Sequence, residues 1–331
     1  MSLYPSAKLV GTLFKAESFA ARPTRDGYGE GLVIAGEKNP NVVALCADLT
    51  ESTRSEAFAL KFPERFFECG VAEQNMATVA AGLATQGKIP FISSYAAFSP
   101  GRNWEQIRTT VAYNGANVKI AGHHAGISVG PDGATHQMTE DVALMRALPN
   151  MSVVVPCDAI EARKATVAAA FAMGPWYLRF AREKSPIMTT DASPFTPGKA
   201  QVMWEVPKPR VAIIACGPIL HAALHAALML ERAGIASVVA NFHTIKPLDG
   251  KKLAELAKKC GAAVIVEEHQ VAGGLGGAVA EYLSRTYPIP LEFVGMQDVF
   301  GQSGTPAELS AHYGLDAPAI LAAAHRAISR A

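Results

Sequence analysis

The sequence predicts an α/β protein with two consecutive three-layer α/β domains and mostly parallel sheets. Short apolar runs typical of buried strands alternate with longer segments in which apolar residues recur at helical spacing. Such alternation is typical of parallel sheets covered by helices on both faces. A proline-rich stretch interrupts the alternation once, and we expect it to separate the domains. The expected boundaries are a first domain over residues 1–190, a linker over 191–208 and a second domain over 209–331.

The first domain is expected to contain four buried strands with helices between them. The strand patterns cover residues 41–49, 88–95, 117–124 and 151–158. The helix patterns cover residues 72–85, 104–113 and 159–172. Ligands of parallel α/β sheets usually bind beyond the carboxyl ends of the strands. We therefore expect a site where these strands end in polar side chains.

The second domain repeats the alternation without a fixed-period repeat. Its strand and helix patterns cover residues 210–217, 219–234, 236–247, 250–261 and 262–269. A glycine cluster, Gly273–Gly277, then opens a further helix, and a phosphate cradle is one interpretation because helix-start amides attract anions. Its spacing is not G-x-G-x-x-G, so tight helix packing is favoured. We assign this domain no chemistry and expect it to serve assembly.

The composition excludes several classes of function. Half of the 331 residues are apolar and 18% are charged, which fits a large core and a buried subunit interface. The formal charge of +1 favours neither nucleic acid nor a membrane surface. The five cysteines are scattered, which argues against a disulfide framework. No apolar run reaches the roughly 20 residues of a membrane span, and no signal-peptide pattern is found. We therefore expect a cytoplasmic protein with reduced thiols and no membrane or nucleic-acid partner.

One carboxylate is conspicuous in the stretch Phe66–Gly87. Glu73 lies in the first turn of an expected small-residue helix, directly after a strand-like run that ends at Val71. Almost nothing else in this stretch is charged. A lone carboxylate at a packed helix start requires an explanation other than solvation, because Glu side chains are mostly exposed.

A long glycine-rich segment follows the third strand pattern. It covers residues 121–146 and carries the titratable side chains of His123, His124, Asp132, His136 and Glu140. Loops of this length with several such groups are more often functional than merely connecting. A metal site is one interpretation, but the histidine spacing does not place ligands on one helix face. Proton transfer or hydrogen bonding to a substrate suits these imidazoles better, although each histidine alone is more often structural.

Two aromatic residues and three arginines each have a structural and a functional interpretation. Tyr95 and Phe98 follow a strand, where they pack in a core or form a platform for a flat heterocycle. For this pair alone, core packing is favoured. The arginines are exposed by default, or they bind a phosphate through paired hydrogen bonds; they are Arg25, Arg179 and Arg182.

Taken together, five segments resemble the transketolase family, in particular its pyrimidine-binding domain followed by its C-terminal domain. The segments are CADLTEST, ECGVAEQNM, SYAAF, GPDGATHQ and LPNMSVVVPCD. The resemblance covers nearly the whole chain, and GPDGATHQ combined with the acidic start of the VAEQNM helix is its most specific part. It implies an enzyme that depends on thiamine diphosphate. The family's diphosphate-binding domain carries G-D-G, which is not found here, so the chain resembles the C-terminal member of a split transketolase.

The resemblance implies a partner chain and an assembly. An N-terminal transketolase subunit is implied to supply the diphosphate site and the Mg²⁺ or Ca²⁺ ion, so no metal ligand is expected in this chain. Coenzyme sites of the family lie between chains. That arrangement implies at least a homodimer, and an α₂β₂ assembly with the partner.

The resemblance also implies roles for individual residues. Glu73 is implied to face N1′ of the aminopyrimidine ring, where a buried carboxyl shares a proton with the ring and tunes the coenzyme. Contacts to the coenzyme are implied for Glu73, Tyr95, Phe98, Asp48 and Leu49. Catalytic roles are implied for Glu73, His136 and His124, with His123 as the alternative to His124. Binding of the substrate is implied for Arg25, Ser52, His124, Asp132 and Arg182.

The implied function is transfer of a two-carbon ketol unit from a ketose phosphate to an aldose or its phosphate. Pentose phosphates are the default substrates, and specialised sugar catabolism is the alternative pathway. Three other functions stay open: the E1 β subunit of a 2-oxoacid dehydrogenase, a fragment of 1-deoxyxylulose-5-phosphate synthase, and a non-catalytic scaffold descended from the family. We favour ketol transfer because the DGATHQ segment suits it and because Glu73 and the loop histidines are present.

Overall fold

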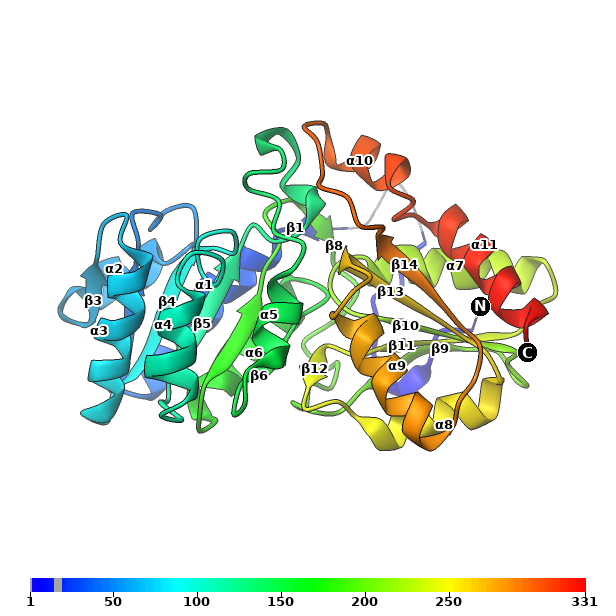
Figure 1. The fold of residues 1–331 in the computed structure, drawn as a ribbon, viewed down its shortest axis with the longest axis horizontal. Coiled ribbons are helices and arrows are strands. Elements are labelled where there is room, and N and C mark those ends of the chain that lie inside the picture. Colours follow the sequence, from blue (N-terminus) through cyan, green and yellow to red (C-terminus); the bar gives the residue numbers. More distant parts are fainter. Residues whose placement is uncertain (1, 15–19) are drawn as a thin grey trace.

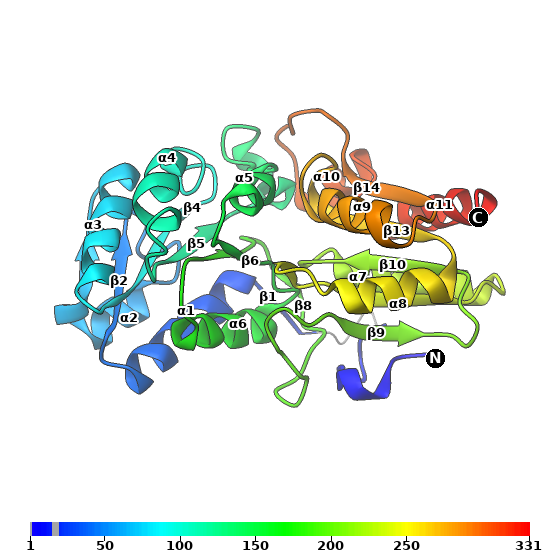
Figure 2. The ribbon, with the colours of Figure 1, turned by 60° about the horizontal axis from the view of Figure 1, so that its bottom comes forward.

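The computed structural model describes residues 2–14 and 20–331, which form two lobes joined side by side (Figure 1). The first lobe contains a seven-stranded sheet and the second a five-stranded sheet. A view turned by 60° shows helices on both sides of each sheet (Figure 2). Each lobe therefore has three layers.

The first sheet is parallel except at one edge. Its strand order is β12-β6-β7-β5-β4-β2-β3, and only β12 runs antiparallel to its neighbour. In that order the strands are Thr244–Lys246, Ser152–Val154, Trp176–Arg179, Lys119–His123, Ile89–Tyr95, Val42–Cys46 and Phe66–Glu68. The central strands β2, β5 and β7 are buried along their whole length. Burial on both faces explains why these strands are nearly continuous apolar runs rather than alternating patterns.

Helices cover both faces of the first sheet. On one face, α1 (Thr24–Lys38) packs closely against α6 (Ala159–Phe171), and α2 (Glu56–Lys61) packs against α1. On the other face lie α3 (Glu73–Thr85) and α5 (Asp141–Ala147), whose apolar side chains join a core with β2, β4 and β5. The shorter helical segments of this lobe are η2 (Pro63–Arg65), α4 (Trp104–Gln106), η3 (Ile107–Ala112) and η4 (Ile127–Asp132).

The second sheet has the order β14-β13-β10-β11-β9, with β9 antiparallel to β11. In that order the strands are Leu291–Met296, Ala263–Gln270, Val211–Ala215, Ser237–Asn241 and Gln201–Glu205. One face packs against α7 (Leu220–Arg232) and α11 (Ala317–Ser329), and the other against α8 (Gly250–Cys260) and α9 (Leu275–Thr286). The helix α10 (Pro306–His312) lies beside η4 of the first lobe (Figure 1).

The two lobes are joined by a strand and by a shared core. After β11 the chain crosses to the first sheet, where Thr244 and Lys246 of β12 pair with β6. Apolar residues from both lobes belong to one continuous cluster, which contains Val153 of β6 and Leu253 of α8. A two-stranded ribbon pairs β1 (Ala21–Arg22) with β8 (Ser185–Pro186), and the one-turn helix η1 (Pro5–Ala7) precedes β1. The second lobe therefore has a fixed position relative to the first.

This architecture confirms the predicted fold class but differs from several predicted elements. The first sheet has strands beyond the four expected, and the expected strand 236–247 is split into β11 and β12 of different sheets. The expected linker, 191–208, includes the edge strand β9, because Met203 and Trp204 are apolar enough to be fully buried in the second core despite the nearby prolines. The expected helix 104–113 begins as α4 and continues as the π-helical turn η3. The Ala112 carbonyl at the end of that turn accepts a hydrogen bond of 3.0 Å from the side chain of Asn150. Within residues 2–14 and 20–331, no helix is long and apolar enough to cross a membrane.

The close packing of α1 on α6 gives a stability prediction. A Cβ atom at Gly27 of α1 would overlap the Ala159 carbonyl oxygen, whereas a Cβ at Gly82 of α3 would meet nothing within 4 Å. We expect Gly27→Ala to lower the free energy of unfolding by about 1–3 kcal/mol, because the two helices must separate. The control, Gly82→Ala, should leave it unchanged or raise it by up to ~1 kcal/mol, because Ala favours helix over Gly. Denaturant unfolding of both variants tests this, and equal effects would contradict the packing.

Candidate active site

The residues predicted from the sequence gather at the carboxyl edge of the first sheet. Asp48 and Leu49 follow β2, Glu73 begins α3 shortly after β3, Tyr95 ends β4, and His124 follows β5. Arg182 lies beyond the end of β7, and Arg25 lies in the first turn of α1. Neighbouring parallel strands end at the same edge, so residues distant in the sequence become neighbours there.

A cleft of about 460 Å³ opens at this edge. Its lining includes the predicted residues Arg25, Asp48, Leu49, Ser52, Tyr95, His124, Asp132 and Arg182. The other lining residues are Thr50, Glu51 and Arg54. Three guanidinium groups thus face one small space, an arrangement that suits an anionic ligand such as a phosphate. All five residues predicted to bind the substrate line this one cleft.

Arg25 connects the cleft residues through hydrogen bonds. Its Nη1 donates to the backbone oxygen of Ser52 at 2.8 Å and to Nε2 of His124 at 2.9 Å. The Ser52 hydroxyl lies 2.7 Å from the hydroxyl of Tyr95. Arg182 donates to the backbone oxygen of Val129 at 2.9 Å and lies 3.4 Å from Oδ1 of Asp132. These contacts fix the positions of both arginines.

The environment of His124 keeps its imidazole neutral. Burial, followed by the positive charges of Arg25 and Arg182, lowers the pKa of His124 to about 3. Arginine can only donate hydrogen bonds, so Nε2 must accept from Arg25 and the ring proton must lie on Nδ1. Among the described residues, Nδ1 has no hydrogen-bond partner. This buried N–H group is therefore free to donate a hydrogen bond to a ligand or to water.

The neighbouring His123 faces away from the cleft. It is fully buried, where it packs against the rings of Tyr28 and Phe180 at centroid distances of 4.8 and 5.1 Å. His124 has a left-handed backbone with φ of 52°, which turns it out of the strand after His123. Of the two adjacent histidines, it is His124 that lines the cleft.

Tyr95, Phe98, His124 and His136 form an aromatic cluster beside the cleft. The Tyr95 and Phe98 rings are nearly parallel with centroids 5.9 Å apart, and His124 stacks on Tyr95 at 3.9 Å. The rings of His136 and Phe98 meet in a T-shaped contact with centroids 5.5 Å apart. A third ring between Tyr95 and Phe98 would need about 7 Å, or two van der Waals separations. The pair can therefore serve as a platform for a flat ring, but not as two plates around it.

Glu73 is buried and forms one ion pair. Its side chain is 1% exposed, and Oε2 lies 2.7 Å from Nη1 of Arg102, which follows Phe98 in the turn after β4. The next residue, Asn103, donates from its side chain to the backbone oxygen of Glu73 at 3.0 Å. No described residue donates a hydrogen bond to the second carboxylate oxygen, Oε1. The side chain is thus almost fully shielded from solvent, and its Oε1 accepts no hydrogen bond from a described residue.

The second lobe holds the loop that carries Asp132 and His136. Glu268 of β13 accepts a hydrogen bond of 2.6 Å from the backbone N–H of Ser128, and the side chain of Gln137 donates to the backbone oxygen of Gln302 at 3.1 Å. Burial raises the pKa of Glu268. The second lobe was expected only to assemble subunits, but it also positions one wall of the cleft.

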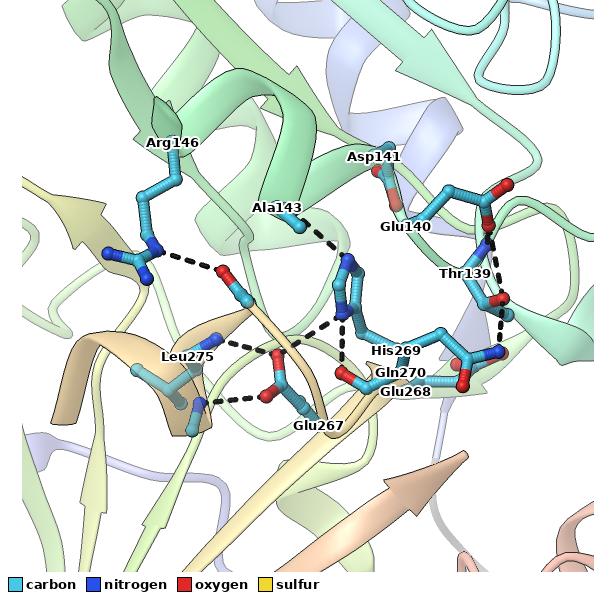
Figure 3. A network of polar contacts seen from close by, with 12 residues as sticks. Thr139, Glu140, Asp141, Ala143, Arg146, Glu267, Glu268, His269, Gln270 and Leu275 are labelled. Carbon is cyan, nitrogen blue, oxygen red and sulfur yellow. Dashed lines mark hydrogen bonds and ion pairs between the residues drawn. The ribbon is translucent and has the colours of Figure 1, made fainter. Parts of the chain in front are cut away.

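A polar network behind this loop ties α5 to β13 (Figure 3). The backbone N–H of Ala143 donates to Nε2 of His269 at 3.3 Å, and Gln270 pairs with Thr139 through backbone and side-chain hydrogen bonds. Nearby, Arg179 is 6% exposed and lies 2.8 Å from Oδ2 of Asp141. Arg179 therefore belongs to the junction between the lobes, and both of its expected roles, exposure to solvent and phosphate binding, are wrong.

The backbone amides of the glycine cluster at the start of α9 bind a carboxylate of the same chain. Glu267 accepts hydrogen bonds from the backbone N–H groups of Leu275 at 2.7 Å and Gly276 at 2.8 Å (Figure 3). A Cβ at Gly274 would overlap this carboxylate, and one at Gly276 would lie 2.8 Å from Phe293. The favoured interpretation, tight helix packing, is confirmed, because these helix-start amides already have their anion.

Sequence reasoning missed two arginines at this edge, Arg102 and Arg54. Arg54 lines the cleft and forms an ion pair of 2.8 Å with Asp26. Both arginines lie in turns, where no periodic pattern points to them; the only signal for Arg102 was its place four residues after Phe98. Among residues 2–14 and 20–331, no group of three His, Cys, Asp or Glu side chains is placed to hold a metal ion.

Comparisons with known proteins match both lobes. The family model of the transketolase pyrimidine binding domain matches residues 20–187, and that of the transketolase C-terminal domain matches residues 198–320. The chain is 46% identical to the "Putative transketolase C-terminal section" of Methanocaldococcus jannaschii, over 89% of this chain and 93% of that protein. It is 40% identical to the 6-deoxy-6-sulfo-D-fructose transketolase subunit SqwH of a Clostridium species, over 92% of this chain and 94% of that subunit. A solved structure described as "Split gene transketolase, inactive beta4 tetramer" has a TM-score of 0.86 and 46% identity, covering 94% of this chain and 99% of that one.

The lowered pKa of His124 predicts a pH-dependent stability. In the unfolded chain this histidine takes up a proton near pH 6.5, but in the folded chain only near pH 3. Stability is therefore complete above pH 6.5 and is lost as the pH falls towards 3, because the unfolded state binds the additional proton. When the pH falls from 7 to 5, the unfolding free energy of the unmodified chain should drop. That of His124→Gln should drop by about 1–2 kcal/mol less, because the variant lacks this titrating group. The exposed His325→Gln is the control, and parallel pH curves for all three proteins would contradict the assignment.

Proposed function

This chain belongs to the transketolase family, and we propose that it is the C-terminal subunit of a split, thiamine diphosphate-dependent transketolase. Two relatives that it covers over more than nine-tenths of their length are named a C-terminal section and a subunit. The reaction is transfer of a two-carbon ketol unit from a ketose phosphate to an aldose or its phosphate. The observation that carries this proposal is the convergence of Arg25, His124 and Arg182 on one cleft, at the same sheet edge as the buried Glu73.

The residues present fit the aminopyrimidine end of thiamine diphosphate. The Glu73 side chain is buried, and no described residue donates a hydrogen bond to its Oε1, which can therefore accept one from a ligand. The Tyr95–Phe98 platform offers an apolar face for a flat ring. We propose that these residues, with Asp48 and Leu49, hold the ring. When bound, the coenzyme supplies the carbanion chemistry that breaks and forms the carbon–carbon bond of the ketose.

Glu73 and the two loop histidines handle protons and orient the substrate. Glu73 is removed from water, so its Oε1 exchanges a proton with the bound ring rather than with solvent. The neutral His124 offers Nδ1–H to an oxygen of the reacting sugar. His136 lies against Phe98 at the rim of the aromatic cluster, where it is placed to contact the same sugar. Asp132 accepts a hydrogen bond from a sugar hydroxyl.

The cleft binds the phosphate of the sugar. The guanidinium groups of Arg25 and Arg182 are fixed by their contacts to Ser52, His124 and Val129, and both line the cleft. Two fixed guanidinium groups suit a dianionic phosphate, because each can donate more than one hydrogen bond. Pentose phosphates are the proposed substrates, and the sulfosugar relative is the reason to test a sulfonate as well.

A second chain completes the site. We propose that an N-terminal transketolase subunit supplies the diphosphate contacts and a Mg²⁺ or Ca²⁺ ion, and that the two chains form an α₂β₂ assembly around a homodimer of this subunit. The relative described as an inactive β4 tetramer supports self-association of this chain without its partner. The cysteines are free thiols in the described residues, which supports a reducing, cytoplasmic location.

An activity assay of the reconstituted complex tests the function. The chain is mixed with the N-terminal subunit, thiamine diphosphate and Mg²⁺, and is offered a ketopentose phosphate with an aldopentose phosphate. We expect a ketol-transfer product from the mixture and from neither subunit alone. Pyruvate decarboxylation without ketol transfer would instead support the 2-oxoacid dehydrogenase alternative. Condensation of pyruvate with glyceraldehyde phosphate would support the synthase alternative.

Glu73 gives the first prediction from this function. Glu73→Gln keeps the size of the side chain but removes the acid–base group, so we expect kcat of the reconstituted enzyme to fall by about 10²–10⁴-fold. The melting temperature of the variant should stay close to that of the unmodified chain. Near-normal turnover at saturating coenzyme would contradict the role.

The two cleft arginines give the second prediction. Arg25→Met and Arg182→Met each remove a charged donor to phosphate, worth about 1.5–3 kcal/mol, so KM for a phosphorylated ketose should rise roughly 10–100-fold. KM for the unphosphorylated ketose should change much less. Arg163→Met on α6, outside the cleft lining, is the control. Equal effects on both ketoses would count against phosphate binding here.

A further inference from the structure

We propose that Arg102 is a positioning residue for Glu73: it holds Oε2 and thereby reserves Oε1 for the coenzyme ring. This inference rests on the proposed function, in which Glu73 faces the aminopyrimidine. It adds a residue to the proposed site and assigns a different partner to each of the two carboxylate oxygens. The geometry that carries it involves both the side chain and the backbone of Glu73.

The turn after β4 holds Glu73 at two points. Arg102 donates from Nη1 to Oε2 at 2.7 Å, and Asn103 donates from Nδ2 to the Glu73 backbone oxygen at 3.0 Å. Asn103 is itself buried and also donates to the hydroxyl of Ser99 at 3.2 Å. The same turn therefore fixes where the first residue of α3 lies and which way its carboxylate points.

The two side chains of the ion pair differ in exposure, and only one of the two carboxylate oxygens is bonded to a described residue. Glu73 is 1% exposed, whereas the Arg102 side chain is 45% exposed. Arginine and carboxylate often pair through two parallel hydrogen bonds, but here only one is formed. Oε1 of the buried carboxylate thus accepts no hydrogen bond from the described residues, although the guanidinium has further N–H donors. A bound donor at Oε1 would complete the pairing.

Arg102 also touches the platform proposed for the coenzyme. Its guanidinium carbon lies 4.7 Å from the centroid of the Phe98 ring, within the range of a cation–π contact. Phe98 in turn lies beside Tyr95. One side chain therefore connects the proposed proton-handling group to the proposed ring platform. Loss of Arg102 would release the carboxylate and leave a buried charge without its cation.

Coenzyme affinity tests this role without relying on turnover. Dissociation constants are measured by titration calorimetry on the reconstituted complex with two probes: thiamine diphosphate, and its analogue with carbon in place of the ring nitrogen N1′. Arg102→Met should raise the dissociation constant of thiamine diphosphate about tenfold, because the charge-assisted contact that orients Glu73 is lost. The dissociation constant of the analogue should rise less than twofold. Arg102→Lys, which keeps the charge, should restore part of the lost affinity. Arg108→Met is the matched control, because Arg108 is exposed and has no described side-chain partner.

Three outcomes for Arg102→Met would overturn the inference. Equal weakening of both probes would indicate a merely structural role. Unchanged affinity would show that Arg102 does not act on Oε1, and tighter binding would show that it competes with the coenzyme. Glu73→Gln separates this inference from the proposed function. If Glu73→Gln weakens the binding of both probes equally, the role of Glu73 itself is wrong. If Glu73→Gln weakens thiamine diphosphate more than the analogue and Arg102→Met does not, only the role of Arg102 is wrong.

Discussion

The interaction on which the candidate site depends is the ion pair between the buried Glu73 and the partly exposed Arg102. A carboxylate that is 1% exposed is unfavourable unless a cation or donor compensates for its lost hydration. The parallel sheet makes this pair feasible, because β3 delivers Glu73 and β4 delivers Arg102 to the same edge. The aromatic platform and the arginine-lined cleft lie at that edge for the same reason. Because parallel strands end at the same edge of the sheet, the acid, the aromatic platform and the arginine-lined cleft all lie there.

The second lobe contributes to the site without lining the cleft. Its edge strand β12 extends the first sheet, and its strand β13 supplies Glu268, which anchors the loop before Asp132 and His136. Arg179, paired with Asp141, also donates from Nη2 to the backbone oxygen of Glu268 at 2.9 Å. A loop that must hold an acid and a histidine against a substrate needs such support, because loops are otherwise the mobile parts of a fold.

Much of the fold was predictable from the sequence, and the site was predictable only in part. Strand ends and the helix start at Glu73 are local patterns, so alternation of apolar runs located them. The choice between His123 and His124 depended on the left-handed turn at His124, which no pattern of side chains reveals. The pairings of Arg102 with Glu73 and of Arg179 with Asp141 join residues 29 and 38 positions apart. Partners at such distances are set by tertiary structure, and the sequence alone could not separate a phosphate-binding arginine from a buried structural one.

Binding of the coenzyme to the separate and combined subunits tests the central claim most directly. Thiamine diphosphate with Mg²⁺ is titrated into this chain, into the N-terminal subunit and into their equimolar mixture. We expect saturable, tight binding only in the mixture, with one coenzyme per pair of chains. Binding by this chain alone with the affinity of the mixture would contradict a site divided between two chains. Absence of binding by the mixture would contradict a coenzyme site beside Glu73.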